Sequence, residues 1–221
     1  MADPARKAAL FEQLARVGKA LGSGKRLELL DLLAQGERSV EDLARAAGLG
    51  LTTASAHLQT LKQANLVATR RDGTRIHYRL ADRDVAELYR RLRDVATAHL
   101  ADAAAARDAY LGPDTEQLTR EQLVRRAAAG DVTVLDVRPT EEYAAGHIPG
   151  AVSIPVDELP ARLAELPDET EVVAYCRGAH CVFAHDAVRY LTGEGRSARR
   201  LTDGMLEWRL AGHPVETGAP S

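Results

Sequence analysis

The stretch LTTASAHLQTLKQANLVATRRDGTRIHYRL, residues 51–80, changes its periodicity part-way along. Residues 52–64 carry apolar side chains at helical spacing, which predicts an amphipathic helix. Residues 67–70 and 75–80 are extended and partly β-branched, and Asp72-Gly73 stands between them as a hairpin signal. The stretch therefore predicts a helix followed by a two-stranded hairpin.

Helical patterns also flank this stretch. Shorter helical runs at 25–34 and 40–47 precede it and are bounded by glycines. Apolar residues at helical spacing occupy 10–21 and 85–96. Helix, turn, helix and then a basic-tipped hairpin is the order of a winged helix-turn-helix. We therefore expect residues 1–105 to form a mainly α domain with a β-hairpin wing.

The helix over 52–64 is expected to begin at a cap on Thr52 or Thr53, because threonine is a favourable N-cap residue. Its apolar face is expected to bury Ala56, Leu58 and Leu61 against the rest of the domain. This leaves a polar face exposed.

That polar face and the hairpin tip together predict a surface for double-stranded operator DNA. Short polar side chains on the helix can reach base edges, and arginines at the tip can straddle the adjacent phosphate backbone. The net charge is +4 over residues 1–112 and −7 over residues 113–221, so the basic segment lies in an acidic chain. The predicted DNA contacts are Thr52, Thr53, Ser55, His57, Gln59, Lys62, Arg70, Arg71 and Arg75.

Residues 10–100 resemble the ArsR-type winged-helix transcriptional repressors, above all in LTTASAHLQTLKQANLV (51–67) and RRDGTRIHYRL (70–80). The resemblance implies a homodimer that pairs through its first and last helices, which matches the apolar stripes at 10–21 and 85–100. A winged helix that binds protein instead of DNA is the alternative.

Many members of that family sense metals, and this sequence departs from their pattern. The helix LELLDLLAQG (27–36) has no cysteine or histidine, and the last helix offers only His99 with scattered aspartates. We therefore expect no metal site and no cofactor.

The second half alternates between strand and helix patterns. Residues 106–116, which include Gly112-Pro113, are expected to be a linker, and residues 117–217 a second domain followed by a tail at 218–221. Thr119 and Gln122 form a capping box, and Gly130 is a plausible helix stop. VTVLDV (132–137) and VVAYC (172–176) read as buried strands, each followed by a helical stretch. This pattern predicts an α/β domain with a central parallel sheet.

Cys176 stands where the second of these strands ends, just before a helical stretch at 182–191. Backbone N–H groups and the positive end of the helix dipole are expected to lower its pKa and make it a nucleophile. Gly178 is expected to let the loop curl, and Arg177 to hold an anionic substrate. The predicted substrate loop also includes Ala179, His180 and Val182.

Three motifs then resemble a single-domain rhodanese over nearly all of 117–217: DVRPTEEYAAGHIPGAVSIP (136–155), YCRG (175–178) and DGMLEWRLAGHPV (203–215). The resemblance implies sulfur transfer, in which Cys176 accepts a sulfane sulfur as a persulfide and passes it to a thiol or to cyanide. Asp136, Arg138, Glu142 and His147 belong to the first motif, and we assign them to turn and ion-pair support.

The loop departs from the rhodanese pattern at its sixth residue, Cys181, and alignment of the next helix allows a loop of eight residues through Phe183. The preferred donor is therefore open, and weak activity with thiosulfate is expected. We predict that Cys181 resolves the persulfide on Cys176 as a disulfide or polysulfide bridge. Two alternatives are a small buried side chain at Cys181 and a zinc site made by Cys176, His180, Cys181 and His185, whose spacing is poor.

Composition narrows the functional class. The chain has 221 residues, is 45% hydrophobic, contains two cysteines and lacks an apolar run long enough for a membrane helix, so a cytoplasmic protein is expected. We predict a dimeric repressor whose second domain senses or processes reactive sulfur, with a sulfur donor and a thiol acceptor as partners. One alternative is a sulfurtransferase whose winged domain provides dimerisation or DNA tethering. The other is a metalloid-responsive regulator that uses Cys176 and Cys181.

Overall fold

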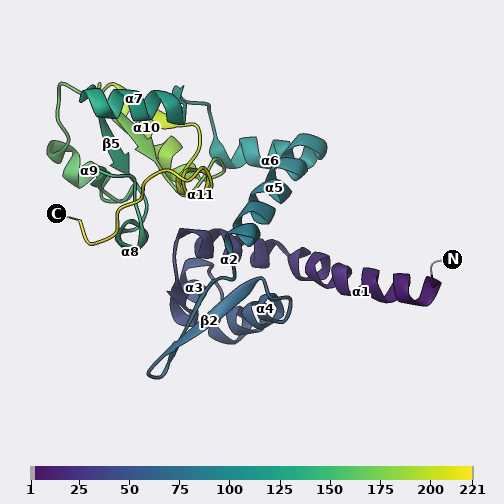
Figure 1. The fold of residues 1–221 in the computed structure, drawn as a ribbon. Coiled ribbons are helices and arrows are strands. Elements are labelled where there is room, and N and C mark those ends of the chain that lie inside the picture. The colour runs from purple at the N-terminus through teal and green to yellow at the C-terminus, as the bar shows by residue number, and fades with distance from the viewer. Residues whose placement is uncertain (1–2, 221) are drawn as a thin grey trace. The chain divides into compact units, whose positions relative to one another are not determined.

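The computed structural model describes residues 3–220, and its contacts divide the chain after Tyr89 into two compact units (Figure 1). The division falls inside the helix α5, Arg83–His99. Unit 1 ends at Tyr89, and unit 2 begins at Arg90.

Unit 1 is a winged helix-turn-helix, as predicted. Its short sheet has the order β1-β3-β2 with antiparallel pairing. Its elements before α5 are α1 (Pro4–Leu21), α2 (Gly24–Gln35), β1 (Arg38–Ser39), α3 (Val40–Ala46), α4 (Leu51–Gln63), β2 (Val67–Asp72) and β3 (Arg75–Leu80).

The helix α4 differs from the prediction at its start and on its buried face. It begins at Leu51 after an N-cap at Gly50 that makes no side-chain hydrogen bond, so the expected cap on Thr52 or Thr53 is wrong. Its buried residues are Ala54, Leu58 and Leu61, which lie three or four positions apart on one face. Ala56 is exposed, because it lies on the opposite side of the helix from this face.

The hairpin of β2 and β3 is confirmed, but its turn lies one residue further on. Val67 pairs with Leu80, and the register continues to Asp72 opposite Arg75. The two-residue turn is therefore Gly73-Thr74, and only its first residue has a positive φ, 58° at Gly73, as in a type II′ turn.

Unit 2 contains a five-stranded parallel sheet of order β4-β8-β7-β5-β6, which confirms the predicted α/β domain. The capping box of Thr119 with Gln122 and the left-handed Gly130 are both present. After α5, its elements are α6 (Ala101–Leu111), β4 (Gln117–Leu118), α7 (Arg120–Ala129), β5 (Val132–Asp136), α8 (Thr140–Ala145), β6 (Val152–Ser153), α9 (Leu159–Arg162), the 3₁₀ helix η1 (Leu163–Glu165), β7 (Glu171–Tyr175), α10 (Val182–Gly193), β8 (Ala198–Leu201) and α11 (Met205–Leu210).

The segment expected to be a linker, residues 106–116, is helical in its first half. Residues 106–111 complete α6, because an alanine-rich sequence has high helix propensity and Gly112 ends the helix with a φ of 70°. Arg189 of α10 donates through its Nη1 to the carbonyl oxygens of Leu111 and Pro113, at 2.9 Å each. The segment after α6 is thereby attached to unit 2.

Two hydrophobic clusters cover the two faces of the parallel sheet. On one face, Leu135 and Ala174 pack with residues of α9 and α10, and both cysteines belong to this cluster. On the other face, Val173 and Tyr175 pack with residues of α7, α8 and α11. Alternation along β7 therefore places Cys176 on the α10 side of the sheet. No helix between residues 3 and 220 is long and apolar enough to span a membrane.

Candidate functional site

The cysteine loop, residues 176–181, connects the carboxyl end of β7 to the start of α10. The amide of Cys181 donates to the Gly178 carbonyl at 3.0 Å, and Cys181 is the N-cap residue of α10. The loop therefore has six residues, and the longer alternative through Phe183 is wrong because Phe183 lies in the first turn of α10.

Cys176 is the more deeply buried of the two thiols, with 1% of its surface exposed. Its Sγ lies 3.4 Å from the carbonyl oxygen of Cys181 and 3.9 Å from that of Gly178. Burial raises the pKa of Cys176 well above its ordinary value, and its hydrogen bond to Cys181 adds to this effect. This direction is opposite to the lowered pKa expected from the sequence, because burial outweighs the nearby backbone groups, and the role of Cys176 as the nucleophile stays a prediction.

Cys181 carries the more acidic thiol. Its pKa is lowered chiefly because the thiol of Cys176 donates a hydrogen bond to it, with smaller contributions from the charge of Arg177 and from backbone N–H groups. Burial acts in the opposite direction but does not prevail. Cys181 also stands at the start of α10, where backbone N–H groups favour a thiolate, whereas the sequence was interpreted as giving this effect to Cys176.

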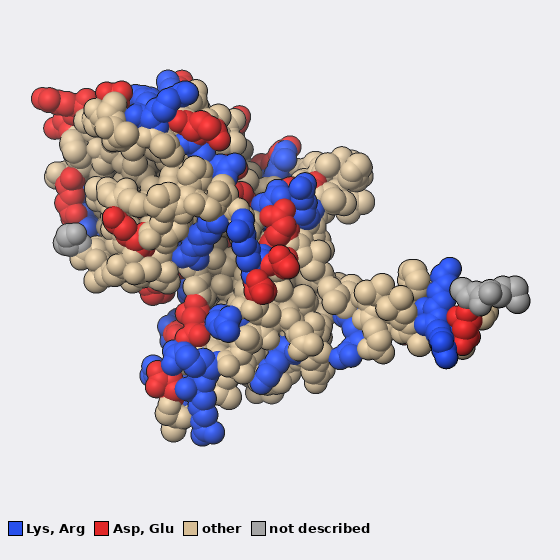
Figure 2. Space-filling view, in the orientation of Figure 1, with Lys and Arg blue, Asp and Glu red and all other residues tan. Residues whose placement is uncertain are grey.

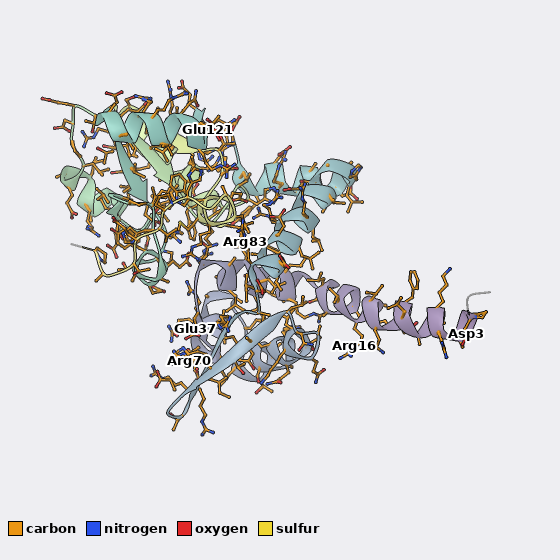
Figure 3. The ribbon with its side chains drawn as sticks, in the orientation of Figure 1. Asp3, Arg16, Glu37, Arg70, Arg83 and Glu121 are labelled. Carbon is orange, nitrogen blue, oxygen red and sulfur yellow. The ribbon has the colours of Figure 1, made fainter. Side chains whose placement is uncertain are left out.

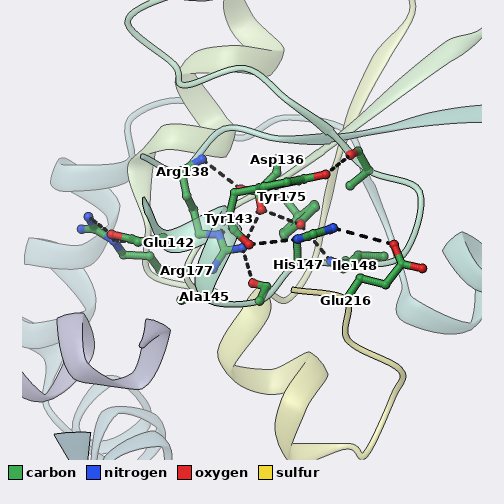
Figure 4. Close-up of polar contacts among 12 residues, drawn as sticks. Asp136, Arg138, Glu142, Tyr143, Ala145, His147, Ile148, Tyr175, Arg177 and Glu216 are labelled. Atoms are coloured by element: carbon green, nitrogen blue, oxygen red, sulfur yellow. Dashed lines mark hydrogen bonds and ion pairs between the residues drawn. The ribbon is translucent and has the colours of Figure 1, made fainter. Parts of the chain in front are cut away.

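Arg177 is held by a carboxylate of the domain itself (Figure 4). Its Nη2 lies 2.6 Å from Glu142 Oε1, and its Nε lies 3.0 Å from both oxygens of that group. The guanidinium also lies 5.1 Å from the centroid of the Phe183 ring. The predicted role of Arg177 as a binder of an anionic substrate is therefore not supported, since Glu142 neutralises its charge.

The other motif residues support the end of the strand (Figure 4). Asp136 and Arg138 are fully buried and form an ion pair at 2.5 Å, and the hydroxyl of Tyr175 donates to Asp136 at 2.6 Å. The ring of His147 stacks on Tyr143 with centroids 3.6 Å apart. These contacts agree with the predicted turn and ion-pair support.

Three residues that the sequence analysis did not single out contact the cysteine loop from α11 and α5. A Cβ on Gly204 would lie 2.3 Å from the Gly178 nitrogen, so only glycine fits there. Glu207 accepts a hydrogen bond from the Gly204 amide at 3.1 Å and forms an ion pair with Arg93 of α5. Gly178 itself has no positive φ; its missing Cβ makes room for Arg93 and Glu207.

The loop also exchanges backbone hydrogen bonds with α11. The amides of Met205 and Leu206 donate to the carbonyls of Cys176 and Arg177, at 2.9 and 3.0 Å. The first turn of α11 and the first half of the cysteine loop are therefore one hydrogen-bonded assembly.

The predicted DNA-binding residues of α4 have different surroundings. Thr52, Thr53 and Lys62 are exposed, while Ser55 and His57 are half-buried. The Gln59 amide donates to the Tyr78 hydroxyl of β3 at 3.0 Å, so this side chain connects α4 to the wing. The exposed face also includes Ala56, which the sequence analysis placed inside.

Basic side chains gather at the wing (Figure 2). Arg71 and Arg75 are exposed next to the turn. Arg70 forms an ion pair with Glu37 at 2.6 Å, and the two side chains lie side by side (Figure 3). The positive charge of Arg70 is thus partly neutralised within the unit.

The zinc alternative requires His180 and His185 to join the two cysteines. Among residues 3–220, no group of three or more histidine, cysteine or acidic side chains is arranged to hold a metal ion. The structure therefore offers no support for that alternative.

Comparison with known proteins finds a family match in each of the two units. Residues 23–69 match the family model described as bacterial regulatory protein, arsR family, and residues 119–211 match the rhodanese-like domain. The chain is 60% identical over 215 residues to the HTH-type transcriptional regulator Rv0324 of Mycobacterium tuberculosis, an alignment that covers 97% of this chain and 95% of that protein. This chain belongs to the ArsR family of transcriptional regulators. It also carries a rhodanese-like domain.

Two other similar proteins each align with about half of this ArsR-type regulator. A sulfurtransferase of Allochromatium vinosum is 35% identical over 104 residues, which are 46% of this chain and 91% of that protein. The winged helix-turn-helix domain of Mb0332 from Mycobacterium bovis is 58% identical, with a TM-score of 0.43, and the match covers 46% of this chain and 93% of that one.

The family matches contain part of the predicted site residues of this ArsR-type regulator. The arsR match includes all of α4 and ends one residue before Arg70. The rhodanese-like match includes the whole cysteine loop and α11.

Proposed function

We propose that this ArsR-type regulator is a homodimeric repressor that binds operator DNA and senses reactive sulfur through its rhodanese-like domain. The observation that carries the proposal is the pairing of the chain's two cysteines in one buried loop, where the Cys176 Sγ lies 3.4 Å from the backbone carbonyl oxygen of Cys181. A thiolate beside a second thiol is suited to capture a sulfane sulfur and then release it as a bridge forms.

The first step uses Cys181, because its thiol is the more acidic and the less buried of the two, at 9% exposed. Its thiolate attacks the outer sulfur of a persulfide R–S–SH. The sulfur–sulfur bond of the donor breaks, R–S⁻ leaves, and a persulfide forms on Cys181. This order reverses the one expected from the sequence, in which Cys176 attacked first.

In the second step, the Cys176 thiol attacks the Sγ of the Cys181 persulfide. The outer sulfur leaves as hydrosulfide, takes up the Cys176 proton and departs as H₂S, and a Cys176–Cys181 disulfide remains. The sulfane sulfur is reduced and the two thiols are oxidised. Both thiols are free and lie five residues apart at the two ends of the same buried loop, which favours this closure.

The route from the cysteine loop to the winged unit runs through α11 and α5. Bridge formation alters the loop whose carbonyls hold the first turn of α11, and Glu207 of that turn is paired with Arg93. Since Arg93 belongs to the helix that continues from unit 1, a change at Glu207 can bias that helix. Bridge formation can lower operator affinity only to the extent that the bridged loop favours the conformation that does not bind DNA over the one that does.

The dimer in this proposal forms through α1 and α5. Leu10, Phe11 and Leu14 of α1 are 57–59% exposed, as is Val95 of α5 at 57%. Burial of such side chains against a second copy contributes roughly 1.5–3 kcal/mol each. The related Mb0332 domain of Mycobacterium bovis is described as homodimeric.

An operator titration tests the proposed function. DNA fragments are selected in vitro for binding to the reduced, full-length protein, and their affinity is then measured with and without inorganic tetrasulfide at matched salt. We expect tetrasulfide to weaken binding at least about tenfold, which corresponds to about 1.4 kcal/mol of coupling. An unchanged affinity after complete modification of both cysteines contradicts the switch.

The wing gives a second prediction, because Arg71 and Arg75 are exposed and we expect them to contact phosphates, while Arg70 is paired with Glu37. Replacing either Arg71 or Arg75 with alanine is expected to reduce the salt dependence of DNA binding by about 0.9 in the log–log slope. The matched control Arg70→Ala is expected to change the slope less. Equal effects of all three substitutions would show that the Glu37 pair does not matter for binding.

Similarity to a sulfurtransferase over 104 residues favours a second candidate, an enzyme whose winged unit provides dimerisation or tethering. Sustained turnover of a sulfur donor with an excess of thiol acceptor, together with no preference for any DNA sequence, would favour this candidate. A single round of H₂S release per protein favours the sensor.

A further inference from the structure

A cavity of about 530 Å³ lies within unit 2, between α6, the cysteine loop, α10 and the end of β8. It is lined by Ala179 and His180 of the loop, and its charged and titratable walls also include Arg107, Asp108, Asp114, His185 and Arg200. The cavity lies outside the sulfur chemistry described above, because neither cysteine is among its lining residues.

Buried polar groups without partners face this cavity. His185 is 3% exposed, and within residues 3–220 neither of its ring nitrogens has a hydrogen-bond partner. The Nε of Arg200 is also buried without a partner in the same described part of the chain. An unsatisfied buried polar group costs roughly 1–3 kcal/mol. Several such atoms around one cavity therefore indicate a polar ligand that completes them.

The charges around the cavity are balanced. Arg107 is hydrogen-bonded to Asp108 at 2.6 Å, while Arg200 lies 3.6 Å from the exposed Asp114. The Nη1 of Arg200 already donates to the carbonyls of Leu201 and Thr202, which fixes the guanidinium in place. The lining thus contains two arginines and two aspartates. Such a lining suits a ligand that carries one positive and one negative group.

We propose that this cavity binds a small zwitterionic amino acid, with its carboxylate at Arg200 and His185 and its ammonium group at Asp114. We further infer that the ligand is an amino-acid persulfide, the R–S–SH donor for the adjoining cysteine loop. This second inference rests on the proposed function. Binding there raises the concentration of this donor next to the loop.

The ionisation of the two histidines agrees with this assignment. Burial, with a smaller contribution from the charges of nearby arginines, lowers the pKa of both His180 and His185 to about 4. Both rings are therefore neutral at pH 7, and His185 offers one N–H donor and one acceptor nitrogen. These are the groups that a carboxylate and an ammonium group require.

Calorimetry with an unreactive probe tests the site in the full-length protein. S-methylcysteine has the carboxylate and the ammonium group but no thiol, so it reports binding without sulfur transfer. We expect it to bind the wild type and the matched control His99→Phe, and to lose at least tenfold in affinity in His185→Phe and Arg200→Met. Circular dichroism of both site variants verifies that they remain folded.

Two further probes define the results that would overturn the proposal. S-methylcysteine methyl ester lacks the carboxylate charge and is expected to bind at least tenfold more weakly. Equal binding of the ester, tighter binding of inorganic sulfate, or no binding of S-methylcysteine contradicts the amino-acid site.

The role of the ligand as a sulfur donor has a separate readout. In the operator titration, His185→Phe is expected to need about ten times more cysteine persulfide for half-maximal release, while its response to inorganic tetrasulfide stays that of the wild type. An equal response of both proteins to cysteine persulfide contradicts the donor role. Failure of the wild type to respond to tetrasulfide contradicts the proposed function instead and leaves S-methylcysteine binding as an independent result.

Discussion

Cys181→Ser is expected to abolish the response of operator binding to tetrasulfide while leaving the affinity of the reduced protein unchanged. Serine has nearly the volume of cysteine, so the N-cap position of α10 is kept, but its hydroxyl does not take up sulfur. Cys176→Ser is expected to stop the sequence one step later, with a stable persulfide on Cys181 and no H₂S release. Mass spectrometry of both variants after treatment locates the added sulfur.

Alkylation of the wild type and of Cys176→Ala, together with persulfide mapping in Cys181→Ser, decides the order of attack. Because the Cys176 thiol is buried and its pKa is raised, we expect limited iodoacetamide to alkylate Cys181 first in the wild type. Cys176→Ala removes the hydrogen-bond donor and is expected to slow alkylation of Cys181 at neutral pH, since the pKa of Cys181 then rises. A persulfide on Cys176 in the Cys181→Ser variant, formed as fast as in the wild type, contradicts this order and supports the one expected from sequence.

Local sequence patterns were sufficient for much of the fold. The capping box of Thr119 with Gln122, the left-handed Gly130 and the hairpin around Gly73 depend on residues within a few positions of each other. The buried face of α4 was predicted less accurately, because Ala54 and Ala56 are the same residue type and the sequence does not distinguish them. Only packing against the rest of unit 1 decides which of the two is buried.

The candidate site was predictable in its position but not in its electrostatics. The end of a buried strand followed by a helix located the cysteine loop from sequence. The acidity of each thiol depends on the depth of burial and on a hydrogen bond between the two side chains, which the sequence does not contain. Arg93 and Glu207 are 114 positions apart, so their ion pair could not be inferred from spacing.

The buried ion pair beneath the cysteine loop gives the largest expected effect on stability. Asp136→Asn keeps the volume of the side chain but removes its charge, so the fully buried guanidinium of Arg138 loses the carboxylate with which it pairs at 2.5 Å. Loss of one partner of such a pair costs roughly 3–5 kcal/mol. Trp208, the one tryptophan of the chain, is buried in unit 2, so its fluorescence in a urea titration reports the unfolding of that unit.

A double substitution separates the charge effect from a loss of packing. Replacing Arg138 with methionine in the Asp136→Asn background removes the buried cation that has lost its partner Asp136, and it is expected to recover a large part of the lost stability, because an apolar replacement of a buried pair is often close to neutral. The exposed pair of Arg162 and Glu165 supplies the control, and Glu165→Gln is expected to change the midpoint little. If Asp136→Asn shifts the midpoint no more than this control, the pair does not hold the end of β7. In that case the Tyr175 hydroxyl, at 2.6 Å from Asp136, would need only a neutral acceptor to keep the cysteine loop in place.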